Sequence, residues 1–212
     1  MIIAIDGPAA AGKGTLGRRL AQHLNIAFLD TGGLYRAVAL KVLDRGADPS
    51  DPAAAEAAAK AIQPSDLETP RLREDRVSQA ASVVAAQPAV RAALLAFQRD
   101  FAHHPPPGFE GALLDGRDIG TVVCPDATVK LFVTASAEAR AMRRFKELQA
   151  AGVGIIYERV LQDIEQRDAR DRERQTAPLR PAGDAIELDT TALDADAAFA
   201  KAADLIARKL KG

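Results

Sequence analysis

The residues with the clearest capacity for chemistry lie within the first fifteen positions. Gly7 to Thr15 read G-x-x-x-x-G-K-G-T, directly after the apolar segment Ile2–Ile5. Glycine lets a backbone approach an anion closely, and a helix that begins at once directs its free N–H groups and positive dipole end toward that anion. Lys13 would then reach the β- and γ-phosphates of a nucleotide, and the Thr15 hydroxyl would hold Mg²⁺. The predicted phosphate loop comprises Gly7, Pro8, Ala9, Ala10, Ala11, Gly12, Lys13, Gly14 and Thr15.

A glycine- and alanine-rich turn between a strand and a helix is the simpler interpretation, and short glycine motifs often occur by chance. The sequence context favours the phosphate loop. Leu16, Leu20 and Leu24 follow it at i, i+4 and i+8, which predicts one apolar face of a helix. The loop therefore has the predicted strand before it and the predicted helix after it that the chemistry requires.

A second polar cluster follows the apolar run Ala27–Leu29 and reads D-T-G-G-L-Y-R, from Asp30 to Arg36. The turn could simply cap a helix, with Thr31 as the N-cap. However, it lies at the carboxyl end of a predicted strand, next to the predicted phosphate loop. Arg36 could bind a second phosphate group there with a forked pair of hydrogen bonds, which lysine cannot do.

A third cluster follows the run Ala112–Leu114 and reads D-G-R-D-I-G-T, from Asp115 to Thr121. An acidic residue after an apolar strand is typical of nucleotide sites in which it orients Mg²⁺ or the water around it. A tight turn with an internal Asp–Arg pair is the alternative. We favour the functional interpretation, because so many charges at a buried strand end are costly without a role.

The segment Arg167–Arg174 reads R-D-A-R-D-R-E-R and is the most basic part of the chain. In a helix, Arg167, Asp171 and Arg174 share one face, because they are spaced i, i+4 and i+7. Alternating charge on a helix is usually a solvated, salt-bridged surface. Beside a phosphate loop, arginines could instead stabilise a transferring phosphoryl group, an effect worth about 10³–10⁵ in rate.

Five continuous apolar runs predict parallel strands covered by helices on both faces. These are Ile2–Ile5, Ala27–Leu29, Ala112–Leu114, Val129–Val133 and Ala185–Leu188. Helices are predicted over residues 13–24, 34–45, 53–62, 74–86, 88–102, 137–151, 155–173 and 194–210. This alternation indicates an α/β fold, a three-layer α/β/α sandwich around a five-stranded parallel sheet, with ligands at the carboxyl ends of the strands.

The composition restricts the class of protein. The chain has 212 residues and a net charge of −1, which suits one α/β domain and argues against nucleic-acid binding. Its single cysteine, Cys124, allows no internal disulfide and suits a reducing compartment. No signal peptide is visible and no run approaches 18 apolar residues, so we expect a cytoplasmic protein with no membrane partner.

Two segments interrupt the alternation of strands and helices. Residues 46–73 carry four prolines around an alanine-rich stretch, which predicts a small surface excursion between the second and third strands. The run H-H-P-P-P-G over residues 103–108 predicts a rigid, solvated loop. Its adjacent histidines could suggest a metal site, but no cysteine lies nearby and neighbouring side chains diverge.

The four motifs G-P-A-A-A-G-K-G-T, D-T-G-G-L-Y-R, D-G-R-D-I-G-T and R-D-A-R-D-R-E-R together resemble the bacterial cytidylate kinase family, in the same order and over nearly the whole chain. The resemblance implies a P-loop nucleoside monophosphate kinase fold in a single domain, 1–212. Its core (1–40, 109–140 and 176–212) would carry an acceptor-binding excursion (about 41–108) and a helical lid (about 141–175). It also implies transfer of the γ-phosphoryl group of ATP to CMP or dCMP, with Mg²⁺ as cofactor.

The resemblance assigns roles position by position. The phosphate loop would bind ATP, with Thr15 on Mg²⁺ and Asp115 acting on the ion through water. The groups that act on the transferring phosphoryl group would be Lys13, Arg117, Arg167 and Arg174. The acceptor would be bound by Thr31, Tyr35, Arg36, Ser82, Arg91, Arg117, Asp118 and Asp171.

Within the acceptor set, the resemblance assigns Ser82, Arg91 and Asp118 to the cytosine base and Asp171 to the sugar hydroxyls. The chemistry suits Asp118, because the exocyclic amino group of cytosine donates a hydrogen bond that a carboxylate accepts. A uracil carbonyl at that place would face the carboxylate as a second acceptor.

The chain departs from the family pattern in two places. Ala10 stands where the loop commonly has glycine, so we expect its backbone to avoid positive φ. Residues 46–80 are shorter, and poorer in strand-like alternation, than the usual acceptor-domain insert.

Two other functions stay open on the sequence. A kinase for adenylate, thymidylate or shikimate could share the scaffold, although D-G-R-D-I-G-T differs from the adenylate-kinase pattern D-G-[FY]-P-R. A nucleotide-dependent switch could share the phosphate loop, although no N-K-x-D or T-K-x-D motif is present. We expect ATP and CMP or dCMP as small-molecule partners, and a monomer.

Overall fold

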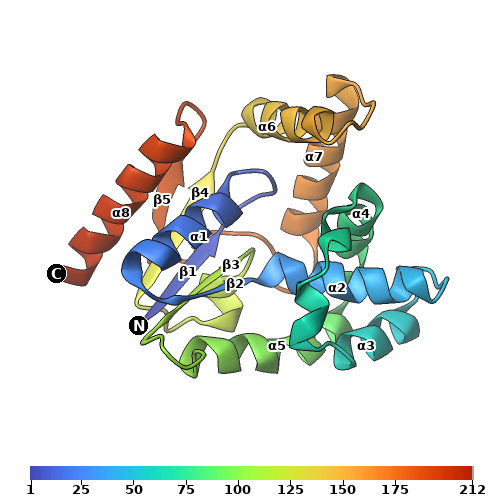
Figure 1. Ribbon diagram of the computed structural model, residues 1–212, viewed down its shortest axis with the longest axis horizontal. Helices are drawn as coiled ribbons and strands as arrows, with labels where there is room; N and C mark the ends of the chain where they lie inside the picture. Colours follow the sequence, from blue (N-terminus) through green and yellow to red (C-terminus); the bar gives the residue numbers. More distant parts are fainter. Residues whose placement is uncertain (212) are drawn as a thin grey trace.

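The computed structural model describes residues 1–211 and joins the five predicted strands in one parallel sheet (Figure 1). Its order is β2-β3-β1-β4-β5, so the central strand β1 lies where the chain changes direction across the sheet. Ligands of open parallel sheets bind at such a switch point, outside the carboxyl ends of the strands. The strands are β1 (Ile2–Asp6), β2 (Ala27–Asp30), β3 (Ala112–Gly116), β4 (Val129–Thr134) and β5 (Ile186–Asp189).

The strand register makes the carboxyl ends level. Asp6 of β1 lies opposite Gly116 of β3, and Asp30 of β2 lies opposite Asp115. The phosphate loop and the turns that follow β2 and β3 therefore leave the sheet side by side. Three of the four motifs singled out in the sequence meet at this edge.

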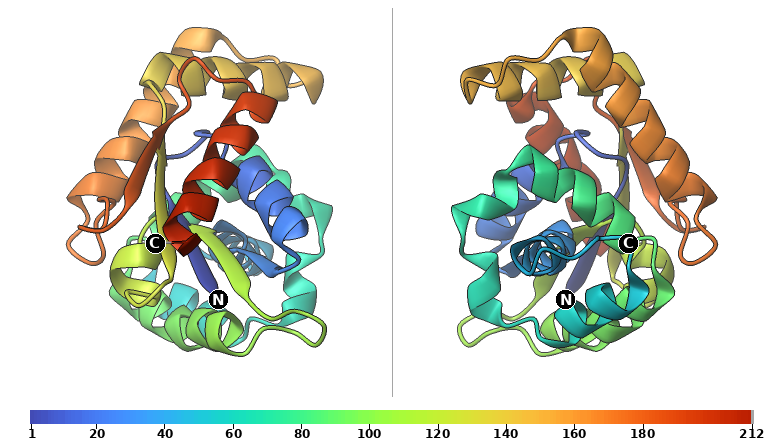
Figure 2. Two further views of the ribbon diagram at one scale, coloured as in Figure 1. Left: turned by 90° about the vertical axis from the view of Figure 1, so that its left-hand side faces the viewer. Right: turned by 90° about the vertical axis from the view of Figure 1, so that its right-hand side faces the viewer.

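Helices cover both faces of the sheet, as the sequence predicts (Figure 2). Helices α1 and α8 lie on one face, and α2, α3, α4 and α5 gather on the other. Helices α6 and α7 pack against each other beyond the carboxyl ends of the strands (Figure 1). Their bounds are α1 (Lys13–Leu24), α2 (Thr31–Asp44), α3 (Pro52–Lys60), α4 (Asp75–Val84), α5 (Pro88–His103), α6 (Ala137–Ala150), α7 (Tyr157–Glu173) and α8 (Ala195–Lys211).

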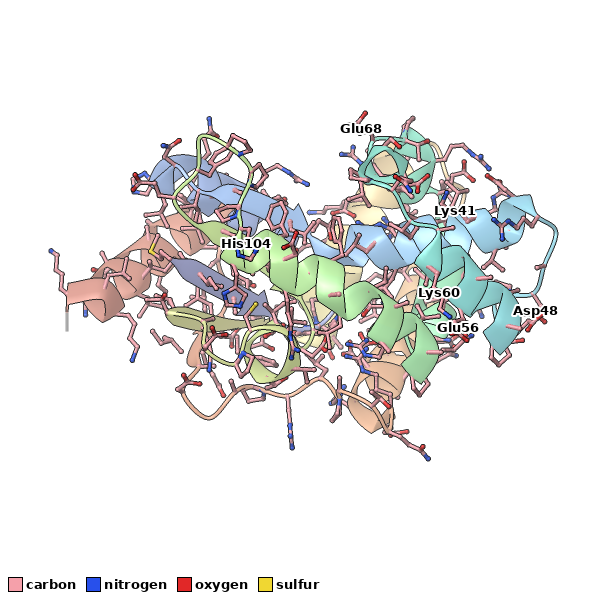
Figure 3. All side chains as sticks on the ribbon, turned by 90° about the horizontal axis from the view of Figure 1, so that it is seen from below. Lys41, Asp48, Glu56, Lys60, Glu68 and His104 are labelled. Atoms are coloured by element: carbon pink, nitrogen blue, oxygen red, sulfur yellow. The ribbon has the colours of Figure 1, made fainter. Side chains whose placement is uncertain are left out.

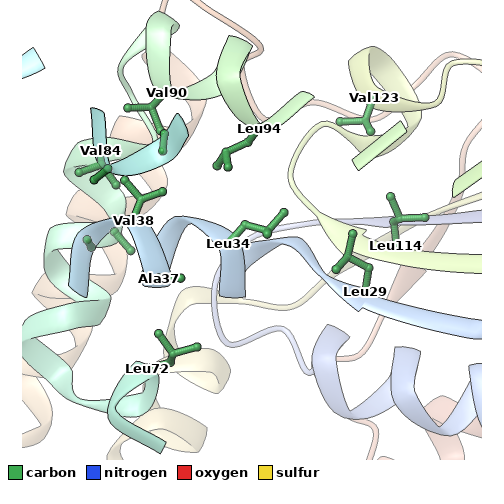
Figure 4. Packing of buried hydrophobic residues seen from close by; sticks show 14 of the residues in the cluster. Leu29, Leu34, Ala37, Val38, Leu72, Val84, Val90, Leu94, Leu114 and Val123 are labelled. Carbon is green, nitrogen blue, oxygen red and sulfur yellow. The ribbon is translucent and has the colours of Figure 1, made fainter. Parts of the chain in front are cut away.

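Alternate side chains of the strands feed two hydrophobic clusters. Ile3 and Ile5 of β1 pack on the side of α1 and α8, whereas Ala4 packs on the side of α2. Figure 4 shows Leu34 and Val38 of α2 within the second cluster. Each fully buried side chain of this size stabilises the fold by about 1.5–3 kcal/mol. The two clusters fix α1 and α2, the helices that begin at the phosphate loop and at the D-T-G-G-L-Y-R turn.

The segment between α2 and α4 holds α3 and two short 3₁₀ turns, η1 (Pro64–Leu67) and η2 (Pro70–Arg73). The small residues Ala55 and Ala58 pack into the same cluster as the sheet. Charged side chains remain outside, as Figure 3 shows for Glu56 and Lys60, which form an i, i+4 ion pair at 2.6 Å. The alanine-rich stretch therefore forms a short helix whose small side chains pack closely against the rest of the domain.

Most helix ends differ from the predicted ones by one or two residues, but α2 begins three residues early, at Thr31. The cap is Asp30 rather than Thr31, since its carboxylate accepts a hydrogen bond from the Gly33 N–H at 3.1 Å. Helix α5 also continues through His103, the first residue of the predicted loop. One π-helical turn, η3 (Ile119–Val123), was not predicted.

Among the described residues, no single helix is both long and apolar enough to cross a membrane, and only the bent pair of α4 and α5, at 100° to each other, passes that test by length and composition.

Candidate active site

The phosphate loop runs from the end of β1 to the first turn of α1, as predicted. Gly7 has φ +148°, and a Cβ atom there would lie 1.9 Å from the carbonyl oxygen of Val133 on β4. Gly12 has φ +87° and is the N-cap of α1, so the free N–H groups of that helix begin at the loop. Glycine is therefore required at Gly7 by close approach to β4 and is favoured at Gly12 by the left-handed backbone.

Three carbonyl groups of the loop accept hydrogen bonds from side chains. Each donor comes from a different part of the chain: the start of α1, helix α6 and the residue after β5. An anion in the loop therefore meets N–H groups, while these carbonyl oxygens are already bonded. The bonds run from Lys13 Nζ to Pro8 O (2.8 Å), from Arg140 Nη1 to Ala9 O (3.3 Å) and from Thr190 Oγ1 to Ala11 O (3.2 Å).

The prediction for Ala10 is wrong. Its φ is +57°, in the left-handed region that the sequence argument excluded. This conformation costs roughly 1–2 kcal/mol for a residue with a Cβ atom. It persists because the Ala9 carbonyl is bonded to Arg140, and because Ala9 and Ala10 pack against apolar side chains of α6 and α7.

A cavity of about 600 Å³ opens beside the loop, at the carboxyl edge of the sheet. It extends from the start of α2, at Asp30 and Arg36, to the connection between β5 and α8, at Thr190 and Leu193. A second cavity of about 230 Å³ adjoins it between α4 and the α6–α7 pair. Lys13, Thr15, Arg36, Asp115, Arg117 and Arg167 all line the first cavity.

Lys13 and Asp115 lie at the base of this cavity, with Nζ and Oδ1 3.9 Å apart. Burial, with Arg117 nearby, lowers the pKa of Lys13 to about 7. Burial also raises the pKa of Asp115, although the charge of Lys13 opposes that shift. Burial thus disfavours the charged forms of both side chains, and a bound anion beside Lys13 and a bound cation beside Asp115 would stabilise them.

The donor atoms at this place suit Mg²⁺. The Thr15 hydroxyl and the Asp115 carboxylate line the same cavity and are oxygen ligands, which this hard cation prefers. Mg²⁺ keeps several waters and binds through one or two protein groups and substrate phosphates. The described residues hold no group of three or more His, Cys, Asp and Glu side chains that could form a closed metal cage.

In the region that the sequence assigns to the acceptor, buried charges of alternating sign form a continuous chain. Arg91 binds the carboxylate of Asp118 through a short hydrogen bond, and Arg174 Nη2 lies 3.6 Å from the same carboxylate. Arg174 Nη1 lies 3.9 Å from Asp171, whose Oδ2 accepts a bond from Arg117 Nε at 3.0 Å. Burial alone raises the pKa of Asp171, but Arg117 and Arg167 hold it below its usual range. We call these five residues the acceptor charge chain.

The acceptor charge chain brings together residues from α5, the end of β3 and α7, which are distant in sequence. The Arg91 guanidinium also lies over the Tyr35 ring, 5.4 Å from its centroid. Of the five residues of the acceptor charge chain, Arg117 alone lines one of the two cavities described above. In this structure Asp118 contacts Arg91 and Arg174, so a base that binds Asp118 must replace part of these contacts.

Several buried polar atoms of the predicted site have no hydrogen-bond partner within the described part of the chain. They are Ser82 Oγ, Arg167 Nε and Arg174 Nη2, each from a residue assigned to the site from the sequence. Buried polar groups are almost always bonded in folded proteins, so such atoms point to an absent ligand or water. Ser82 lies buried on α4 and makes no hydrogen bond to Asp118 or Arg91.

Arg36 and Thr31 are already engaged. Arg36 Nη2 binds Asp30 at 2.5 Å, so an acceptor phosphate would compete with Asp30 for this arginine. The Thr31 hydroxyl donates to the Asp115 carbonyl at 2.8 Å and joins α2 to the end of β3.

Arg167 reaches the cavity beside the loop from α7. It lines both cavities and forms no ion pair with another described residue. Burial, together with the charge of Arg117, lowers its pKa to about 10. A polyphosphate bound in the cavity would offset this by stabilising the charged guanidinium of Arg167.

Sequence reasoning missed several residues that shape the site. Asp6 is buried, and its two carboxylate oxygens accept bonds from the N–H groups of Ile119 and Gly120, both at 2.7 Å. This contact fixes the π-helical turn next to Asp118. An acidic residue at the end of an apolar strand was the available signal for Asp6. Arg140 had no signal, because charged residues on helices are usually exposed.

Comparisons with known proteins identify the family of the chain. A model of the cytidylate kinase family matches residues 3–208. The chain belongs to the cytidylate kinase family. A cytidylate kinase of Paramagnetospirillum magneticum is 62% identical over 208 residues, which are 98% of either chain. A cytidylate kinase of Rhodospirillum rubrum is 58% identical over 209 residues, 99% of this chain and 98% of the relative.

A solved structure agrees at the level of the fold. An uncharacterized protein from Eubacterium ventriosum aligns over 100% of this chain and 99% of its own, with a TM-score of 0.54 at 14% identity. The three-layer sandwich expected from the sequence is confirmed, as are the family and its phosphotransferase activity toward CMP or dCMP.

Proposed function

We propose that the chain carries out this transfer, from the γ-phosphate of ATP to the phosphate of CMP or dCMP, in the cavity between the phosphate loop and α7. The observation that most supports the location is the convergence of Lys13, Arg36, Arg117 and Arg167 on one cavity beside the acceptor charge chain. Such a cluster of cations is costly without anions, and two phosphorylated substrates would supply them.

ATP would bind with its phosphates in the loop and its base toward Thr190 and Leu193, at the other end of the cavity. Lys13 would contact the β- and γ-phosphates. Mg²⁺, held by Thr15 and reached by Asp115 through water, would neutralise phosphate charge. The loop itself is already shaped for this role, since its carbonyls are bonded elsewhere.

CMP would bind on the acceptor side, with its phosphate at Arg36 and Arg117. The cytosine amino group would donate to Asp118, and Arg91 would hold that carboxylate in place. Asp171 would accept from the sugar hydroxyls. Thr31 would support the site through its bond to the Asp115 carbonyl, and Tyr35 by packing under Arg91. The Ser82 hydroxyl, which has no partner among the described residues, would form a hydrogen bond with the base.

The transfer itself needs no general base, because the acceptor phosphate is already anionic near neutral pH. Catalysis then depends on in-line positioning and on neutralising the charge that the transferring group spreads over its oxygens. Arg117, Arg167 and Arg174, with Lys13, would supply that charge.

We further propose that the parts of the domain follow the family division. Residues 1–40, 109–140 and 176–212 would form the core, about 41–108 the acceptor-binding excursion and about 141–175 the lid. The net charge of −1 and the single buried cysteine support a cytoplasmic protein that binds nucleotides rather than nucleic acid. We also propose that it acts as a monomer.

An acceptor panel tests the function. ADP release from ATP and Mg²⁺ would be followed with CMP, dCMP, UMP, AMP and dTMP as acceptors. We expect CMP and dCMP to give the highest kcat/KM. Lys13→Ala should lower kcat by about 10² or more while the fold survives, because it removes charge at the transferring group. Stimulation by none of the acceptors, or strongest stimulation by AMP, would contradict the proposal.

A further inference from the structure

A buried ion pair outside the proposed substrate contacts joins α6 to α7. Arg140 is 4% exposed and Asp168 is 3% exposed. The guanidinium and the carboxylate form a two-pronged pair, with Nη1–Oδ1 at 3.0 Å and Nη2–Oδ2 at 2.6 Å. Such a forked arrangement fixes the relative orientation of its partners as well as their distance.

The same guanidinium also bonds to the backbone in two places. Nε donates to the Ala135 carbonyl, just beyond β4, at 2.9 Å, and Nη1 donates to the Ala9 carbonyl at 3.3 Å. Ala9 belongs to the phosphate loop and packs in one apolar cluster with Ala141, Val160 and other residues of α6 and α7. One arginine thus connects the end of β4, the phosphate loop and α7.

Asp168 lies on α7 between two residues of the proposed site, so the rotation of the helix that its ion pair fixes also sets which side chains face the cavity. Its neighbour Arg167 lines the cavity, and Asp171 on the next turn binds Arg117. Successive residues of an α-helix are about 100° apart around the axis. Fixing the Asp168 carboxylate on Arg140 therefore fixes the direction in which Arg167 points.

We propose that the Arg140–Asp168 pair positions Arg167 relative to the phosphate loop. Arg140 bonds to the loop and to α7, so the loop and the Arg167 guanidinium keep a fixed relative orientation. This inference rests on the proposed function for the role of Arg167. Stability alone gives little reason for the pair, since apolar residues of similar volume often replace a buried ion pair without loss of stability. The specific effect of this ion pair is that it aligns α7 with the phosphate loop.

The test replaces both charges at once, by Arg140→Met with Asp168→Leu, because removal of one partner would leave the other buried and unpaired. We expect a folded protein with a melting temperature close to that of the wild type. Its kcat should fall about tenfold or more, through misplacement of a transition-state contact, while KM for CMP changes by about twofold or less.

The matched control removes the other arginine on the same carboxylate. Arg172 Nη2 lies 3.4 Å from Asp168 Oδ2, but its side chain is 63% exposed. Arg172→Met should therefore keep wild-type kcat. Arg140→Lys is a second variant that retains the charge and the fold. It cannot reproduce the fork to Asp168 and Ala9, so we expect a kcat loss of about tenfold as well.

A double-mutant cycle shows whether the pair acts through Arg167. Arg167→Ala should lower kcat much less in the Arg140→Met, Asp168→Leu background than in the wild type. Losses that simply multiply, or wild-type kcat in Arg140→Lys, would overturn the proposal. Failure of the wild-type protein to phosphorylate CMP would instead contradict the proposed function, so the two failures are distinguishable.

Discussion

Lys13 is the residue whose protonation should respond most to substrate. Its pKa is lowered to about 7 by burial, with Arg117 adding to the shift. A polyphosphate would favour the charged ammonium and raise the pKa again. ATP binding at about pH 8, where nucleotide phosphates are already ionised, should therefore take up protons from the buffer.

Calorimetry in buffers of different ionisation enthalpy measures this uptake, without Mg²⁺ so that metal binding displaces no proton from Asp115. Lys13→Met should abolish most of it. The size of the uptake is informative: no proton uptake by the wild type would mean that Lys13 is already fully charged in the free protein.

Asp118 should set the choice of base. Asp118→Asn keeps an oxygen for Arg91 but offers an amide N–H₂ that suits the uracil carbonyl. We expect kcat/KM for CMP to fall and the CMP-to-UMP preference to narrow by about tenfold or more, since a site built around a polar group strongly rejects an analogue that leaves it unpaired. ATP affinity is the control and should change little. Unchanged discrimination would place the base-reading group elsewhere.

The residues of the site were predictable to the extent that their chemistry is local. The motif G-x-x-x-x-G-K-G-T specifies a backbone shape, and D-G-R-D-I-G-T follows a clear apolar strand. Asp6, Arg140 and Thr190 act on backbone groups of distant segments, which no local pattern reveals. The positive φ of Ala10 was missed for the same reason, because contacts from α6 and α7 stabilise it.

At the scale of elements, α7 combines two kinds of arginine. Arg167 forms no ion pair with a described residue and has an unbonded Nε, so its main partner should be the transferring phosphoryl group. Arg167→Ala should lower kcat and kcat/KM together, by about 10² or more. Arg167→Lys should restore little of the activity, because lysine cannot form the fork. Wild-type kcat in both variants would reduce this face of α7 to a structural surface.

Arg174 differs, because it already contacts Asp118 and Asp171 and donates to the Ala177 carbonyl at 2.6 Å. It caps the end of α7. Arg174→Ala should therefore change both kcat and KM for CMP. Asp171→Ala should act mainly on KM for CMP. Initial-rate measurements with CMP varied at saturating ATP separate the two effects.

The strands and helices themselves were largely predictable, since five continuous apolar runs and their intervening helical patterns all became elements. The early start of α2 and the π-helical turn η3 were not, because a carboxylate at a strand end shapes each of them.

For the molecule as a whole, the cationic cavity opposes stability in the absence of substrates. The pKa of Arg167 is lowered to about 10 by burial and by Arg117. Because the folded state disfavours the charged form, charged Arg167 destabilises the free protein near neutral pH. Arg167→Met should therefore raise the melting temperature, by about 2–4 °C if the relief is about 1 kcal/mol.

Sulfate should raise the melting temperature of the wild type more than chloride does at equal ionic strength, and this excess should shrink in Arg167→Met. Scanning calorimetry measures both effects. A lower melting temperature for Arg167→Met would show that its packing outweighs the charge repulsion.

The position of β1 at the centre of the sheet also has a consequence during synthesis. Its partners are β3 and β4, and among the described strands β2 pairs with β3 alone. No strand pair can form until residues 112–116 have been translated, roughly 5–20 s after Ile2–Ile5 at typical rates. Throughout that interval the nascent chain carries an unpaired apolar segment that neighbouring chains could capture. The strand that leads into the phosphate loop is therefore the one that waits longest for its partners during synthesis.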